Sequence, residues 1–243
     1  MHEELNLKKV FAPTGELRAV INLGNAILAK AGVEHEEPSG VSVDLAKKFA
    51  LQLGVPLKLI PVKKAADAVN YVATANADIG FFAIDPERAQ LISFTQPYVV
   101  IEGGYMVPQN SAIQSVDEVD HKGIRVVVGQ GSAYDLHLSR SLKHAEIVRA
   151  ANSQTVVDHF LENGYEVAAG VKQQLELDAE RVGSAVRILP SHFMEIPQAM
   201  GVSKKRGGLA AEYLNQFVRL VKASGEVQQI LDANQAKGAS VAK

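Results

Sequence analysis

Residues 40–60, GVSVDLAKKFALQLGVPLKLI, decide the fold class, because they combine one amphipathic helix with one strand. The apolar side chains recur at every fourth position and therefore share one helix face: Leu45, Phe49 and Leu53. Ser42 can cap the start of this helix, and Gly54 can end it in the left-handed conformation. Residues 55–60 are branched and bounded by prolines, as is typical of a strand. A helix followed closely by a strand predicts an α/β fold.

The same alternation continues on both sides of this stretch. The first series adds two strands and one helix, at 17–23, 78–83 and 63–75. The second series has strands at 124–128, 146–149 and 165–169, and helices at 132–142 and 153–163. Extended segments connect the two series, at 91–94, 98–107 and 196–202, and two helices close the chain. Two such series predict two lobes, each a mostly parallel sheet covered by helices, with a ligand cleft between them near the carboxyl ends of the strands.

The composition excludes several classes of protein. The 243 residues carry a net charge of −2, so the basic surplus of a nucleic-acid-binding surface is absent. Because the chain has no cysteine, it has neither disulfides nor thiolate zinc sites, and its seven histidines show no metal-ligand spacing. We expect no metal and no cofactor. We interpret residues 204–206, KKR, as a solvated loop, and we expect the small, polar tail after Ala233 to fray.

Two polar side chains that follow predicted strands each admit two interpretations. Arg88 belongs to the run DIGFFAIDPERA, residues 78–89, and can either bind a carboxylate with its forked donors or pair with Asp85 on the surface. Ser132 follows a Gly-Gln-Gly turn at the start of a predicted helix, where free N–H groups form a natural anion site. Its hydroxyl can also cap that helix, assisted by Asp135. From the residues alone, both interpretations of each side chain stay open.

The order of these features is similar to that of the extracellular solute-binding proteins of family 3, the receptors of polar-amino-acid ABC importers. Four segments carry the resemblance in the right order and spacing: GVSVDLAKKFALQLGVPLKLIPV at 40–62, DPER at 85–88, SFTQPYV at 93–99 and GIRVVVGQGSAYDL at 123–136. The resemblance implies a two-lobed periplasmic-binding-protein fold that closes over a small ligand by hinge bending. It places lobe 1 at residues 1–106 and 200–243, and lobe 2 at residues 107–199.

The resemblance also implies which residues bind the ligand. Arg88 matches the arginine that grips the carboxylate of the ligand, and Ser132 matches the hydroxyl residue at the start of the helix in lobe 2. The backbone N–H groups of Ser132 and Ala133 would then face the same anion. Further candidates lie in the loops and strand ends around these two residues: Asn22, Asn25, Phe81, Phe82, Ala83 and Gln130. Period-two alternation puts one of the two phenylalanines in the core, and the asparagines can alternatively shape their loop.

Departures from the family pattern restrict the ligand. The aspartate that binds the ammonium group of an amino acid is missing, and Gly170, Val171 and Lys172 occupy that region. A buried ammonium without a carboxylate partner is costly. The resemblance therefore implies a small carboxylate, either an organic acid or an amino-acid-like zwitterion whose cation is held elsewhere.

The expected function is that of the substrate-binding component of an ABC importer: a periplasmic monomer that binds a small carboxylate and a membrane permease, without catalysis. No secretory signal and no apolar run of membrane-spanning length is visible in the sequence. The periplasmic location is therefore implied by the resemblance alone, and a form that is not exported stays open. One alternative is an enzyme similar to the cyclohexadienyl dehydratases, with Glu166 or Glu195 as general acid. Another is a binding module that senses its ligand.

Overall fold

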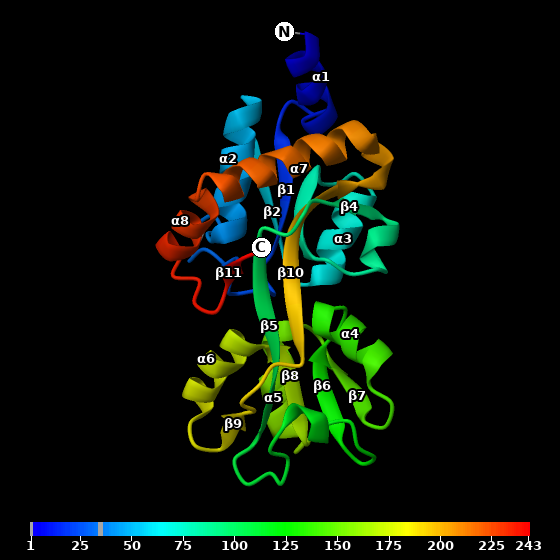
Figure 1. The fold of residues 1–243 in the computed structure, drawn as a ribbon, viewed down its shortest axis with the longest axis vertical. Helices are drawn as coiled ribbons and strands as arrows, with labels where there is room; N and C mark the ends of the chain where they lie inside the picture. The colour runs from blue at the N-terminus through cyan, green and yellow to red at the C-terminus, as the bar shows by residue number, and fades with distance from the viewer. Residues whose placement is uncertain (1, 34–35) are drawn as a thin grey trace. The chain divides into compact units, whose positions relative to one another are not determined.

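The computed structural model describes residues 2–33 and 36–243, and the chain forms two compact units. Unit 1 comprises Met1–Val100 and Pro197–Lys243, and unit 2 comprises Ile101–Ile196 (Figure 1). The chain passes between the units at 100/101 and at 196/197, close to the predicted lobe limits at 106/107 and 199/200. Within the described residues, no helix is both long and apolar enough to cross a membrane.

The sheet of unit 1 has the strand order β2-β1-β3-β10. The first three strands are parallel: β1 (Leu17–Asn22), β2 (Leu57–Val62) and β3 (Ile79–Ala83). β10 (Met194–Ser203) runs antiparallel to β3 and also pairs with β4 (Ile92–Phe94). The parallel arrangement that the sequence predicts is therefore confirmed for β1 to β3, although β2 begins two residues later than expected.

The described residues of unit 1 form five α-helices: α1 (His2–Phe11), α2 (Val41–Leu53), α3 (Ala65–Ala73), α7 (Gly207–Ala223) and α8 (Glu226–Ala233). Gly54 ends α2 with φ 63°, as predicted. The predicted cap at Ser42 is wrong, because α2 begins after Gly40 and Ser42 lies buried within its first turn. At Gly40, with φ 121°, a Cβ would come within 2.6 Å of the Leu28 carbonyl oxygen, so only glycine fits this entry to the helix.

Two further expectations about unit 1 are wrong for long-range reasons. Residues 204–206 form a short 3-10 helix, η4 (Lys204–Arg206), in which Lys204 and Lys205 are exposed as expected. Arg206 instead bonds to Asp78 and to the Val10 carbonyl. The tail after Ala233 does not fray, because β11 (Ser240–Val241) pairs with residues 99 and 100 of β5 (Val99–Pro108). Neither partner is a sequence neighbour, so local composition gave no signal of these contacts.

The buried carboxylate of Asp78 connects several elements of unit 1. It precedes β3 and has no solvent exposure. Arg18, in β1, donates to it from the backbone N–H (2.8 Å), from Nε (2.9 Å) and from Nη2 (2.8 Å), and Arg206 donates from η4. The same Asp78 hydrogen bond raises the pKa of Arg18. One acid therefore joins the amino ends of two strands to the segment before α7.

The sheet of unit 2 has the order β5-β8-β6-β7, with β9 pairing to β5. Its other strands are β6 (Arg125–Gly129), β7 (Glu146–Ala150), β8 (Val167–Val171) and β9 (Val186–Ile188). Its α-helices are α4 (Ala133–Ser141), α5 (Val156–Glu162) and α6 (Lys172–Val182). β6 is parallel to β7 and to β8, as predicted, whereas β5 is antiparallel to β8. The β8 strand begins two residues later than expected.

Alternate residues of β6 enter two hydrophobic cores, one on each face of the unit 2 sheet. Val126 and Val128 pack with Tyr134 and Leu138 of α4. Val127 packs on the opposite face with residues of α5 and α6, including Phe160. Both faces of this largely parallel sheet are thus covered, and the polar ends of the strands are left for other contacts.

The Asp78 cluster makes a testable contribution to stability. Asp78→Asn leaves Arg18 and Arg206 without their shared carboxylate, and we expect the free energy of unfolding to fall by about 3 kcal/mol, as for other broken buried pairs. As a control, Asp158→Asn removes an exposed partner of Arg181, at 2.8 Å, and should cost less than about 1 kcal/mol. Urea unfolding followed by circular dichroism measures both, and equal effects of the two substitutions would contradict this role of Asp78.

Candidate functional site

The carboxyl end of β3 leads directly into the turn that carries Arg88. All five residues of β3 are buried. Asp85 then shapes the turn: its Oδ1 accepts the Glu87 N–H at 2.8 Å, and its carbonyl accepts the Ala89 N–H at 2.9 Å. These bonds start the short 3-10 helix η1 (Arg88–Gln90). Arg88 is therefore placed by backbone hydrogen bonds at the sheet edge where α/β proteins bind ligands.

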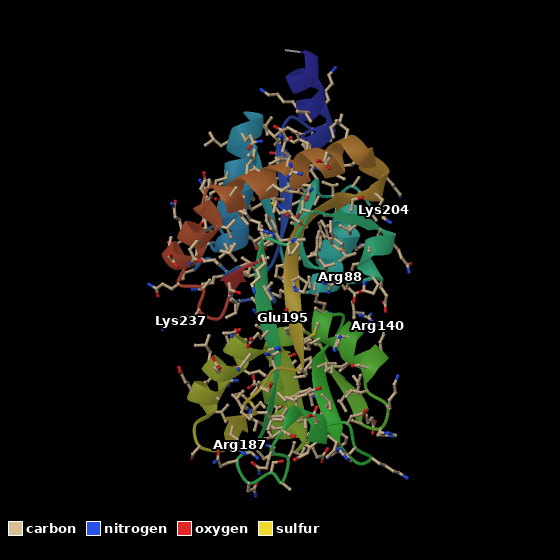
Figure 2. All side chains as sticks on the ribbon, viewed as in Figure 1. Arg88, Arg140, Arg187, Glu195, Lys204 and Lys237 are labelled. Carbon is tan, nitrogen blue, oxygen red and sulfur yellow. The ribbon has the colours of Figure 1, made fainter. Side chains whose placement is uncertain are left out.

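The Arg88 side chain is buried, with 6% exposure (Figure 2). Its Nη1 donates to the Ala83 carbonyl oxygen at 3.2 Å, which turns the guanidinium back toward the end of β3. Burial lowers the pKa of Arg88, and the charges of Asp85 and Glu87 oppose that effect. Asp85 is 4% exposed, so the interaction between Arg88 and Asp85 that the sequence also allowed is buried and does not lie on the surface. A guanidinium withdrawn from water at a strand end is a candidate for anion binding.

The two phenylalanines of β3 lie on opposite faces of the unit 1 sheet. Phe82 belongs to a hydrophobic core with Val20, Val72 and Ile92. Its ring occupies the space that a Cβ at Gly80 would need, at 2.3 Å, so glycine is required there. Phe81 instead contacts the Tyr98 ring in an edge-to-face arrangement, with ring centroids 6.3 Å apart. Phe82 is thus a core residue of unit 1, and Phe81 stays the better ligand candidate.

The loop after β1 contains both predicted asparagines. Asn22 Oδ1 accepts the Gly24 N–H at 3.0 Å, so this side chain shapes its own loop. The backbone carbonyl of Asn25 accepts from Leu28 (3.1 Å) and Ala29 (2.9 Å). The Asn25 Oδ1 atom is buried and has no hydrogen-bond partner. Of the two side chains, Asn25 is therefore the one with an unused acceptor.

In unit 2, Ser132 is the N-cap residue of α4. Its Oγ accepts the Asp135 N–H at 3.0 Å, and Asp135 Oδ2 accepts the Gly131 N–H at 2.9 Å, so the capping interpretation is correct. The Ser132 N–H is also used, because it donates to the Gly129 carbonyl at 3.0 Å. Ala133 is the first residue of α4, where N–H groups have no acceptor within a helix. The predicted pair of N–H donors is thus reduced to Ala133, and the Ser132 side chain is also hydrogen-bonded with the side chain of Tyr134.

Two glycines position this turn. A Cβ at Gly129 would lie 2.7 Å from the backbone of Ser153, and Gly131 has φ 72°. Gln130 lies between them with an exposed side chain, and its N–H donates to the Ala150 carbonyl at 3.0 Å. The side chain of Gln130 is therefore available at the carboxyl end of β6.

Of the two general acids that the enzyme alternative nominates, Glu166 is held in an ion pair. Glu166 precedes β8, at the amino end of the strand, and pairs with Arg125 Nη2 at 2.6 Å. This hydrogen bond lowers the pKa of Glu166, so the carboxyl does not hold a proton for catalysis near neutral pH. Glu195, in β10, is exposed. Among the described residues, no group of three histidines or acids could hold a metal ion.

Several polar groups near the strand ends were missed by the sequence analysis. Glu102 in β5 contacts both Lys172 Nζ, at 3.6 Å, and His192 Nδ1, at 3.3 Å. Tyr98 is fully buried, which raises the pKa of its phenol. The sequence did carry a signal for Glu102, because this residue is an acid inside the otherwise apolar run 99–107. The partners of Tyr98 and Glu102 are distant in sequence and gave none.

Comparison with known sequences matches residues 29–234 to the bacterial extracellular solute-binding proteins, family 3. A membrane-bound lytic murein transglycosylase F of Idiomarina loihiensis is 31% identical over 103 residues, which are 42% of this chain and 23% of that protein. The amino-acid-binding protein AabA of Dichelobacter nodosus is 21% identical over 139 residues, 56% of this chain and 55% of that protein. The chain thus spans less than two thirds of the length of these curated relatives.

Solved structures show the same fold. The amino acid ABC transporter substrate-binding protein AbpA of Streptococcus pneumoniae, bound to L-arginine, has a TM-score of 0.78 at 20% identity, over 95% of this chain and 99% of that one. The ancestral amino acid-binding protein AncCDT-1, a precursor of cyclohexadienyl dehydratase, has a TM-score of 0.77 at 19% identity, over 94% and 99%. At these identities the likeness establishes the fold alone.

The N-cap role of Ser132 is testable through stability. Ser132→Ala removes the acceptor for the Asp135 N–H and should lower the free energy of unfolding by about 1 kcal/mol, whereas Ser132→Asp should largely preserve it. Ser141→Ala, near the exposed end of α4, is the control and should change stability by less than about 0.5 kcal/mol. Thermal and urea unfolding measure all three, and an undiminished stability of Ser132→Ala would refute the capping role.

Proposed function

The chain belongs to the bacterial extracellular solute-binding proteins of family 3, and on this premise we propose that it captures a small carboxylate-bearing solute for an ABC-type importer. The solute is held by closure of two lobes about a hinge, and a membrane permease receives it from the closed form. The protein acts in the periplasm as a monomer. Its task is binding, and catalysis is not part of it.

The buried guanidinium of Arg88 is the observation that carries this proposal. The charges of Asp85 and Glu87 already act on this guanidinium, and a planar carboxylate matches the forked donors of arginine. Arg88 has 6% exposure and lies beside the Ala83 carbonyl at the end of β3. This location supports binding of the ligand carboxylate through Arg88, with Ala83 and Phe81 as neighbouring contacts.

The start of α4 supports a second contribution from unit 2. The Ala133 N–H lies in the first helical turn, and the helix dipole favours an anion there. The Ser132 hydroxyl and the Gln130 side chain offer further polar contacts at the same turn. In unit 1, the unpartnered Asn25 Oδ1 can accept from a hydroxyl or ammonium group of the solute, while Asn22 and Phe82 support the loop and the core.

Binding of L-arginine by AbpA supports an amino-acid-like solute, because that protein shares this fold. The residues at the end of β8 support an organic acid instead, since Gly170, Val171 and Lys172 offer no carboxylate for an ammonium group. Both classes of solute carry a carboxylate, and in this proposal Arg88 binds it.

The enzyme alternative is favoured by one observation, the likeness to AncCDT-1, a precursor of cyclohexadienyl dehydratase. The ion pair of Glu166 with Arg125 opposes it, because a carboxyl held in its charged form cannot act as a general acid. We therefore expect no product when the protein is incubated with prephenate or arogenate and the absorbance of the aromatic product is followed. Turnover by the wild type would overturn the assignment as a binding protein.

Arg88→Ala should weaken binding of the best carboxylate found in a thermal-shift panel. Loss of a charge-assisted hydrogen bond costs about 1.5–3 kcal/mol, so the dissociation constant should rise at least about tenfold in isothermal titration calorimetry. Arg88→Lys should recover only part of the loss, because an ammonium lacks the forked geometry.

Arg219→Ala is the matched control, because it removes the same charge from the exposed face of α7 in unit 1. It should leave the affinity unchanged. If Arg88→Ala and Arg219→Ala bind the carboxylate as tightly as the wild type does, Arg88 is not in the binding site.

A further inference from the structure

Lys172 occupies the edge of the unit 2 sheet that carries the Ser132 turn. It follows Val171, the last residue of β8, and begins α6. β8 is parallel to β6, with Val126 opposite Val167 and Val127 opposite Ala168. The carboxyl ends of the two strands therefore share one edge, and Lys172 and the turn after Gly129 both leave from it.

The Lys172 side chain is held in place and is only partly exposed. A Cβ at Gly104 would lie 3.2 Å from Lys172 Cβ and 3.3 Å from its Cγ, so the absence of a side chain there lets the lysine stem lie against β5. Its Nζ lies 3.6 Å from Oε2 of Glu102, which precedes Gly104 by two residues and so lies on the same face of β5. The exposed fraction of the side chain is 22%. Packing and charge together thus fix where this ammonium group lies.

The Glu102 contact leaves Lys172 able to bind another anion. An ammonium group has three donor hydrogens, and 3.6 Å is longer than a hydrogen bond. The other oxygen of Glu102 has its own partner, His192 Nδ1 at 3.3 Å. Lys172 therefore has donor hydrogens left for a second carboxylate while Glu102 stays in place.

We propose that Lys172 selects the solute by charge and binds a second carboxylate, so that the protein captures a small dicarboxylate. This inference rests on the proposed function, in which Arg88 takes the first carboxylate. Beside Glu102, the Lys172 ammonium group offers hydrogen-bond donors to an acidic group, and it has no acceptor for the ammonium group of an amino acid. Lys172 is thus a specificity-determining residue of the binding site.

The test compares ligands that differ at one end only. Dicarboxylates of three to eight carbons, straight and aromatic, are titrated calorimetrically beside analogues in which one carboxylate is replaced by a methyl or an aminomethyl group. We expect the best dicarboxylate to bind at least about tenfold more tightly than either analogue, a difference of about 1.4 kcal/mol. Tighter binding of a monocarboxylate or an amino acid by the wild type overturns the inference.

Variants then assign the preference to Lys172. Lys172→Gln should abolish the preference for the dicarboxylate, whereas Arg88→Ala should weaken binding of the dicarboxylate and of its methyl analogue alike. Lys122→Gln is the matched control, because it removes the same charge from an exposed position before β6, at the opposite end of that strand. It should keep the preference intact. Circular dichroism and melting temperatures confirm that each variant is folded.

The outcomes separate this inference from the function on which it rests. If a carboxylate binds through Arg88 but Lys172→Gln keeps the full preference, the inference fails and the proposed function stands. If Glu102→Gln instead abolishes binding of an aminomethyl analogue that the wild type prefers, Glu102 holds an ammonium group and the inference fails. If no member of the panel binds the wild type, the proposed function fails and the inference with it.

Discussion

The carboxylate of Asp78 is the charge on which the arrangement of unit 1 depends. It has no solvent exposure, and it accepts three hydrogen bonds from Arg18 and one from Arg206. An unpaired carboxylate at this depth would be strongly unfavourable, so both arginines have to be in place when β1, β3 and η4 come together. This requirement fixes the amino end of β3 and hence the position at which its carboxyl end presents Arg88.

Unit 2 uses the same arrangement with a different acid. Arg125, at the start of β6, donates to Glu166 from its backbone N–H (2.9 Å), from Nε (2.8 Å) and from Nη2 (2.6 Å), and Glu166 directly precedes β8. In both units an arginine on one strand and an acid just before a neighbouring parallel strand join the two strands at their amino ends. Charged groups used for stability thus lie at one end of each sheet, and Arg88 and Lys172 lie beyond the opposite ends of their strands.

The sequence predicted the features that depend on local pattern. The parallel series β1-α2-β2-α3-β3, the glycine at the end of α2 and the cap at Ser132 all follow from periodicity and turn chemistry within a few residues. Apart from the Ser42 cap and the starts of β2 and β8, the errors arose where a distant residue decides the outcome. Arg206 bonds to Asp78, 128 positions away, and the tail is ordered by pairing with β5. The core position of Phe82 depends on space left by Gly80 and by Gly201 across the sheet, which no single strand reveals.

The central claim is that the carboxylate of a solute is bound by the buried guanidinium of Arg88. A crystal structure of the protein with its tightest-binding carboxylate tests this most directly. The account predicts two carboxylate oxygens at hydrogen-bond distance, about 2.7–2.9 Å, from two nitrogens of Arg88. A carboxylate bound to other donors, with no contact to the Arg88 guanidinium, would contradict it.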